Sequence, residues 1–134
     1  MSAPHKYRVL VVDDEPSVLT TYRMILEQKG YDVVAAASSN EARRALGSEK
    51  LDLLLCDLSL EKQDSGFEVI HYARQHQPGL PALLLTGYAS HDVSDRAKRD
   101  GISVLFKPID IEEFLQTISA QLRSSHGQFK VSGQ

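Results

Sequence analysis

The sequence has few of the features that mark several large classes of protein. Its 134 residues include one cysteine and no tryptophan. A single cysteine excludes an internal disulfide, so a reducing compartment is the default. No apolar run approaches the roughly 20 residues that a membrane-spanning helix needs, and the first residues lack the apolar stretch of a signal peptide. We therefore expect a cytoplasmic protein with no membrane partner.

The charge balance gives no sign of a nucleic-acid partner. The formal net charge is −3 and the pI is near 5.9, whereas a DNA-binding surface needs a basic patch. With 42% hydrophobic and 25% charged residues, the composition is typical of a globular domain that buries its own core. We expect one domain with no direct DNA binding.

Short apolar segments alternate with amphipathic ones along the chain. Five of them have the character of buried strands: 8–12, 32–36, 51–56, 80–85 and 102–106. Each is followed by a segment with helical spacing, and these helices are expected to begin near Pro16, Asn40, Gly66, His91 and Ile111. This alternation predicts an α/β fold, a doubly wound five-stranded parallel sheet with helices on both faces.

The domain organisation follows from the same pattern. Residues 1–6 form an N-terminal arm, 7–123 one folded domain, and 124–134 a flexible tail or the start of a linker, because the last stretch has little to bury.

Polar side chains stand where four of the five strands end. Asp13 and Asp14 follow the first, Asp57 the third, Thr86 the fourth and Lys107 the fifth. Ligands of open α/β sheets bind beyond the carboxyl ends of the strands. Carboxylates without histidine or thiol partners suit a hard cation such as Mg²⁺. Beside it, lysine and hydroxyl groups can bind phosphoryl oxygens, and an aspartate can form an acyl phosphate.

Each of these residues also has an ordinary structural explanation. The acid pair could complement a helix N-terminus, Asp57 could be a turn residue, and Thr86 and Lys107 could simply end their strands. Four such coincidences at one edge of one sheet would be needed, so the joint pattern favours a functional site.

The motifs VLVVDDEP, LLLCD, LLLTG and FKP occur in this order. With these motifs the chain resembles the receiver domain of two-component response regulators, including the chemotaxis regulators, over residues 7–123. The resemblance implies a flavodoxin-like (βα)5 fold with strand order 2-1-3-4-5, for which the chemotaxis member of this family is a standard example.

The resemblance also implies the roles of the acidic residues. Asp57 would accept a phosphoryl group from a partner histidine kinase or histidine phosphotransfer protein. Asp14 and Asp57 would bind Mg²⁺ directly, together with the backbone carbonyl of Ser59, and Asp13 would act through a water. Mn²⁺ would substitute for Mg²⁺. The downstream target is not implied.

The remaining site residues are implied in the same way. Lys107 would pair with the phosphoryl oxygens and Thr86 would turn inward to bond the phosphoryl group. The Lys107–Pro108 bond would be cis, a form accessible because proline follows. The domain would be a regulatory phosphoacceptor and not an enzyme, apart from its own phosphotransfer and dephosphorylation.

Three positions depart from the family pattern. Val104 stands where an aromatic switch residue is usual, Tyr88 is large for its position, and the loop after Asp57 lacks the usual proline and reaches Gly66 about one residue late. We therefore expect readout to depend on the backbone of residues 87–91, with Tyr88 as the candidate aromatic. Alternatively, Tyr88 shields the acyl phosphate from water.

Two other functions are compatible with part of the pattern. An aspartyl-phosphate hydrolase of small phosphoesters generally has a second aspartate where this chain has Ser59, and it tends to carry a cap domain for which there is no room. A phosphate-independent interaction module on the same fold would not need the acidic, hydroxyl and lysine positions. The sequence leaves open the cognate kinase, the oligomeric state, and whether the chain works alone or belongs to a larger regulator or hybrid kinase.

Overall fold

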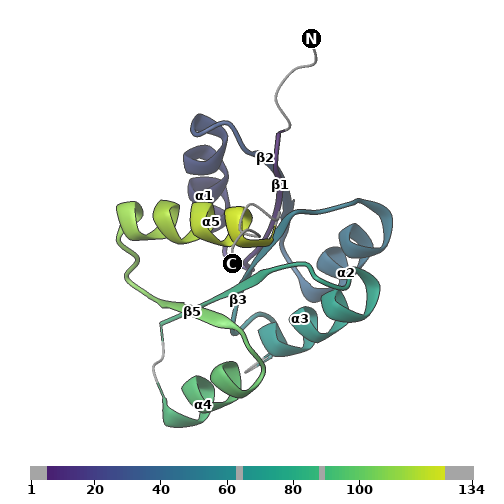
Figure 1. Cartoon of the computed structure of the whole chain (residues 1–134), viewed down its shortest axis with the longest axis vertical. Coiled ribbons are helices and arrows are strands. Elements are labelled where there is room, and N and C mark those ends of the chain that lie inside the picture. Colours follow the sequence, from purple (N-terminus) through teal and green to yellow (C-terminus); the bar gives the residue numbers. More distant parts are fainter. Residues whose placement is uncertain (1–5, 63–64, 88–89, 126–134) are drawn as a thin grey trace, which may run out of the picture.

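The computed structural model describes residues 6–62, 65–87 and 90–125. One parallel sheet crosses the molecule in the order β2-β1-β3-β4-β5 (Figure 1). Its strands are β1 (Arg8–Val12), β2 (Asp32–Ala36), β3 (Leu53–Asp57), β4 (Ala82–Thr86) and β5 (Ser103–Phe106). The predicted doubly wound sheet and its strand order are confirmed.

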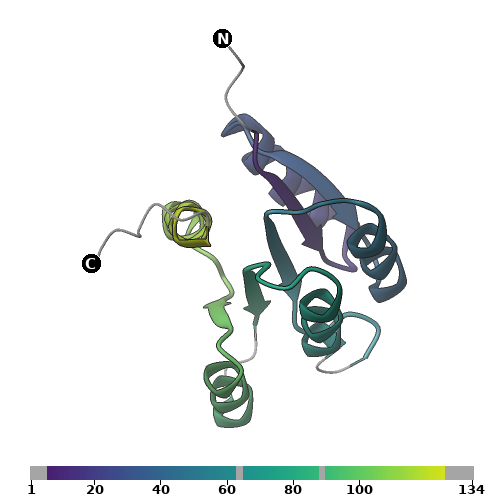
Figure 2. The same ribbon diagram turned by 45° about the vertical axis from the view of Figure 1, so that its right-hand side comes forward.

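Helices cover both faces of the sheet. They are α1 (Pro16–Gln28), α2 (Ser39–Ser48), α3 (Ser65–His76), α4 (His91–Arg99) and α5 (Ile111–Ser125). Helices α1 and α5 pack on one apolar layer of the sheet, and α2, α3 and α4 pack on the other (Figure 2). Among the described helices, none has both the length and the apolar character that crossing a bilayer requires.

The central strands divide their side chains between two apolar layers. Leu53 and Leu55 of β3 belong to the layer under α1 and α5, whereas Leu54 and Cys56 belong to the layer under α2, α3 and α4. Every residue of β3 and β4 is buried, which explains why these strands are almost continuously apolar in the sequence. The sheet is therefore held firmly on both faces.

Some element boundaries differ from the sequence expectation, and the differences matter at the carboxyl edge. β3 ends at Asp57 and β4 ends at Thr86, so both residues are the last of their strands and do not follow them. β4 begins only after Pro81, since proline has no N–H for the strand ladder. α5 continues to Ser125, because polar residues at a helix end leave no apolar signal to mark the boundary.

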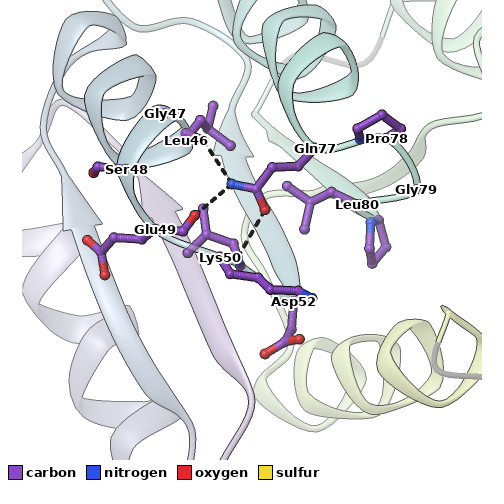
Figure 3. A pocket seen from close by; sticks show the side chains of 12 residues that line it. Leu46, Gly47, Ser48, Glu49, Lys50, Asp52, Gln77, Pro78, Gly79 and Leu80 are labelled. Atoms are coloured by element: carbon purple, nitrogen blue, oxygen red, sulfur yellow. Dashed lines mark hydrogen bonds between the residues drawn. The ribbon is translucent and has the colours of Figure 1, made fainter.

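The amino edge of the sheet is tied together by Gln77, which follows α3. Its Nε2 donates to the carbonyls of Leu46 at 2.9 Å and Glu49 at 2.7 Å. Its Oε1 accepts the Leu51 N–H at 3.0 Å. These bonds line a hollow of about 500 Å³, shown in Figure 3. The amide of Gln77 therefore joins two loops at the edge opposite the strand-end carboxylates.

The aromatic pair Phe114 and Tyr22 supports a first prediction. Phe114 of α5 is fully buried and stacks on Tyr22 of α1 with ring centroids 5.2 Å apart. Phe114→Ala should lower the free energy of unfolding by about 3–5 kcal/mol. The matched control Phe106→Ala removes a ring that is 45% exposed and should lower it by less than about 1 kcal/mol. Urea denaturation checks both values, and equal losses would contradict the placement of the two rings.

Candidate functional site

The parallel register brings the strand-end residues to one edge. Val12 of β1 lies beside Cys56 of β3, so Asp13 and Asp57 follow at the same level. Thr86 of β4 pairs with Phe106 of β5, and the Lys107 N–H donates to the Thr86 carbonyl at 2.8 Å. Residues separated by up to 94 positions are thereby gathered at the carboxyl edge of the sheet.

Lys107 bridges two of the carboxylates. Its Nζ lies 2.8 Å from Asp57 Oδ1 and 3.7 Å from Asp13 Oδ2. The side chains of Lys107 and Asp57 are only 27% and 12% exposed, so water screens this contact less than a surface ion pair. The 2.8 Å contact has the length of a charge-assisted hydrogen bond. Lys107 is therefore held in place against the carboxylate group.

The three aspartates form a compact oxygen cluster. One carboxylate oxygen from each of Asp13, Asp14 and Asp57 lies within 4.8 Å of the others. Asp13 is 1% exposed, and although its Oδ1 accepts the Glu15 N–H at 2.9 Å, its Oδ2 has no hydrogen-bond partner. A buried carboxylate oxygen without a donor is costly. Oxygen donors without nitrogen or sulfur partners fit a hard divalent cation such as Mg²⁺.

The electrostatics of the cluster shift two pKa values. Burial raises the pKa of Asp57, the Lys107 hydrogen bond and charge oppose this, and the charges of Asp13 and Asp14 add to the rise, so the pKa is raised overall. For Lys107, burial acts to lower the pKa, but the hydrogen bond and the charges of Asp57 and Asp13 outweigh it and raise the pKa. The ammonium therefore stays charged at neutral pH, while ionised Asp57 is under electrostatic strain.

The other residues singled out from the sequence lie near this edge or outside the described part. Thr86 is buried, Ser59 is exposed in the loop after β3, and the Lys107–Pro108 bond is cis. Val104 of β5 is half-buried and packs against the apolar layer under α4. Tyr88 lies outside the described residues.

Two contributions to this edge are not visible in the pattern of strand ends. Glu61 accepts hydrogen bonds from the N–H and the hydroxyl of Ser39, both at 2.7 Å, which ties the loop after β3 to α2. A Cβ on Gly66 would overlap the carbonyl oxygen of Asp57 and lie 2.8 Å from the Cα of Leu58. Gly66 therefore lets α3 start directly against the backbone of β3. The late glycine in the sequence was the signal for this contact, whereas nothing in the sequence pointed to Glu61.

Other candidates in the described structure carry less chemistry. Cys56 is fully buried, and burial raises the pKa of its thiol well above the ordinary value, which agrees with the role of a small core residue. The hollow beside Gln77 lies at the opposite edge of the sheet (Figure 3). The carboxylate cluster with Lys107 is therefore the candidate functional site.

Comparisons with known proteins agree with this geometry. Residues 9–119 match the response regulator receiver domain family. The transcriptional regulatory protein GlrR of Escherichia coli is 36% identical over 118 residues, covering 87% of this chain and 26% of GlrR. The response regulator protein PilR of Pseudomonas aeruginosa is 31% identical over 119 residues, covering 88% of this chain and 26% of PilR. A CheY-like receiver domain protein of Methanospirillum hungatei has a TM-score of 0.86 at 29% identity, covering 93% of this chain and 100% of that one.

The chain belongs to the response regulator receiver domain family. Members of this family are regulatory domains of two-component systems that accept a phosphoryl group on an aspartate. The chain spans about a quarter of the length of the curated relatives GlrR and PilR.

The raised pKa of Asp57 predicts how the stability of the protein changes with pH. Because the pKa of Asp57 is raised in the folded protein, its ionisation lowers stability as pH rises from the ordinary value of 3.8 through the folded pKa. Asp57→Asn should therefore raise the melting temperature at pH 7, and this gain should shrink toward pH 4. Melting curves at several pH values check this.

Metal binding gives the second half of the same experiment. Mg²⁺ at ten times its Kd should stabilise the wild type by about 1.4 kcal/mol, since it binds only the folded state. Asp57→Asn should gain less from Mg²⁺ because one of the three clustered carboxylates is lost. If neither the substitution nor Mg²⁺ changes the melting temperature, the carboxylates do not share one cation.

Proposed function

We propose that this receiver domain is a Mg²⁺-dependent switch in which Asp57 accepts the phosphoryl group. The observation that carries the proposal is the 2.8 Å contact of Lys107 with Asp57 inside a cluster of three carboxylates. The donor is a phosphohistidine of a sensor histidine kinase or a histidine phosphotransfer protein. The result is read by protein contacts, in the cytoplasm and without direct DNA binding by this chain. The functional unit runs from residue 7 to the end of α5 at Ser125, two residues beyond the boundary expected from the sequence.

The transfer forms one bond and breaks one. A carboxylate oxygen of Asp57 attacks phosphorus while the bond from phosphorus to the donor breaks, and the donor leaves with that electron pair. Negative charge then moves from the carboxylate to the phosphoryl oxygens. The Lys107 ammonium, already 2.8 Å from Asp57 Oδ1, transfers its hydrogen bond to a phosphoryl oxygen. The hydroxyl of Thr86, the last residue of β4, donates to another.

The metal-binding residues are those whose oxygens stand at this edge. Asp13, Asp14, Asp57 and the backbone carbonyl of Ser59 would hold Mg²⁺ or, in its place, Mn²⁺. When bound, the cation neutralises charge on the transferring group. The Oδ2 of Asp13 accepts no hydrogen bond and lies 3.7 Å from Lys107 Nζ, so it would gain a closer partner in this way.

The alternative functions have weaker support. A phosphoester hydrolase needs a second acid near the nucleophile, and the residue two positions after Asp57 is Ser59, whose side chain cannot serve as that acid. A phosphate-independent module has no use for a lysine held between two buried carboxylates, since unneutralised buried charges lower stability.

The proposed chemistry is tested by intact mass. Incubation with acetyl phosphate and Mg²⁺ should add one phosphoryl group to the wild type, and EDTA should abolish the addition. Asp57→Asn should not be labelled, whereas the control Asp95→Asn, on the exposed surface of α4, should be labelled as the wild type is. Equal labelling of wild type and Asp57→Asn would refute the assignment.

The readout of phosphorylation is proposed to differ from an aromatic rotation. Val104 has no ring, its β-branch restricts χ1, and it is already packed against the apolar layer under α4. A valine side chain in this position cannot switch between an exposed and a buried rotamer as an aromatic ring can. The backbone of residues 87–91 is therefore the proposed readout segment, with Tyr88 either as its aromatic or as a shield of the acyl phosphate.

NMR with a phosphoryl analogue tests this readout. Binding of the analogue with Mg²⁺ should shift amide resonances within 87–91 more than that of Val104, because Thr86 at the end of β4 is joined directly to this segment. Large shifts limited to Val104 and the rest of β5 would contradict the proposal.

A further inference from the structure

The first residue of α3 holds the loop that follows β3. Ser65 is 4% exposed. Its hydroxyl accepts a hydrogen bond from the Leu60 N–H at 2.9 Å and donates one to the Lys62 carbonyl at 2.8 Å. The hydroxyl thus uses both its donor and its acceptor capacity inside the protein. The loop is fastened from within by one buried side chain.

The next residue of α3 holds the same loop one step closer to Asp57. The Gly66 N–H donates to the Leu58 carbonyl at 2.6 Å, and the absence of a Cβ permits this approach. Leu58 in turn donates its N–H to the Leu85 carbonyl of β4 at 2.8 Å. Ser59 therefore lies between a peptide group fixed by Gly66 and one fixed by Ser65.

Because of the geometry of the peptide group, the hydrogen bond from the Leu60 N–H to Ser65 also constrains the direction of the neighbouring carbonyl. The peptide group that joins Ser59 to Leu60 is planar, and in the trans form its C=O and N–H point in opposite directions. The only cis bond within the described residues is Lys107–Pro108. When Ser65 binds the Leu60 N–H, it therefore fixes the direction of the Ser59 carbonyl, which points away from Ser65.

We propose that Ser65 is a positioning residue that sets the affinity of the metal site by orienting the Ser59 carbonyl. The inference rests on the proposed function, in which that carbonyl is a ligand beside Asp13, Asp14 and Asp57. Mg²⁺ requires nearly ideal octahedral geometry, so a ligand whose peptide group can rotate contributes less than one that is held. Ser65 itself touches neither the metal nor the phosphoryl group.

The size of the expected effect follows from other metal sites. Loss of a group that orients a ligand typically weakens metal binding about 10- to 100-fold. The ligand here is one backbone carbonyl among carboxylates, so the lower end applies. Ser65→Ala should raise the Kd for Mg²⁺ about tenfold. Ser65→Cys, which is close in size but has only weak hydrogen-bonding capacity, should act in the same direction.

The experiment measures the metal directly and does not depend on phosphorylation. Free Mn²⁺ is followed by electron paramagnetic resonance during titration of the whole chain, and Mg²⁺ is measured by competition. The matched control is Gln77→Ala, which loses three hydrogen bonds at the opposite edge of the sheet (Figure 3). It should lower stability but leave the Kd within about twofold of the wild type, since distant sites act independently.

A second measurement reports on the peptide group itself. In metal-free wild type the Leu60 amide should exchange its hydrogen slowly, because it is bonded to a buried hydroxyl, and Ser65→Ala should speed this exchange about tenfold, the loss of roughly one hydrogen bond. Rapid exchange of Leu60 in the wild type would overturn the inference even if neither Ser65 variant folds.

The outcomes separate this inference from the proposed function. A wild type that binds neither Mn²⁺ nor Mg²⁺ overturns both. A wild type that binds the metal while Ser65→Ala and Ser65→Cys bind it equally well overturns the role of Ser65 alone. Equal weakening by Ser65→Ala and Gln77→Ala would also overturn it, since the effect would then be a general loss of stability. Weakening in the Ser65 variants only supports it.

Discussion

Three carboxylates and one ammonium meet at the carboxyl edge of the sheet, and the balance between them constrains the rest of the site. Lys107 lies 2.8 Å from Asp57 and 3.7 Å from Asp13, yet the pKa of Asp57 stays raised because burial and the neighbouring aspartates outweigh the lysine. One cation therefore does not neutralise the cluster. The cluster could hold a divalent cation, which would add the positive charge that Lys107 alone does not supply.

The fold maintains this unfavourable arrangement because the central strands beneath it are buried between two apolar layers. Side chains of β3 alternate between two apolar layers, and every residue of β3 and β4 is buried. The register of these strands cannot slip by one residue without moving a whole set of apolar side chains to the wrong face. The energy gained in the two layers thus stabilises a polar edge that would otherwise repel itself.

The chain belongs to the receiver family, whose members accept a phosphoryl group on an aspartate, and this relates the electrostatic arrangement to phosphorylation. In the proposed function, phosphorylation of Asp57 would move negative charge from its carboxylate to the phosphoryl oxygens, and the Lys107 ammonium and the Thr86 hydroxyl would then bind those oxygens. Loop segments at strand ends can move more easily than the buried strands, because fewer apolar contacts hold them. In the loop after β3, the contacts made by Ser65, Gly66 and Glu61 limit this freedom.

Much of the fold and the candidate site follows from the sequence alone. The alternation of apolar and amphipathic segments determined the βα order. The polar residues at the ends of four of the five apolar runs identified the edge that carries Asp57 and Lys107, since both signals are local. Two features could be seen only in the tertiary structure. The Oδ2 of Asp13 is buried without a hydrogen-bond donor, and the Leu60 N–H donates to the Ser65 hydroxyl. Such contacts depend on how elements pack and on where a loop turns, and neither is encoded in the periodicity of a single segment.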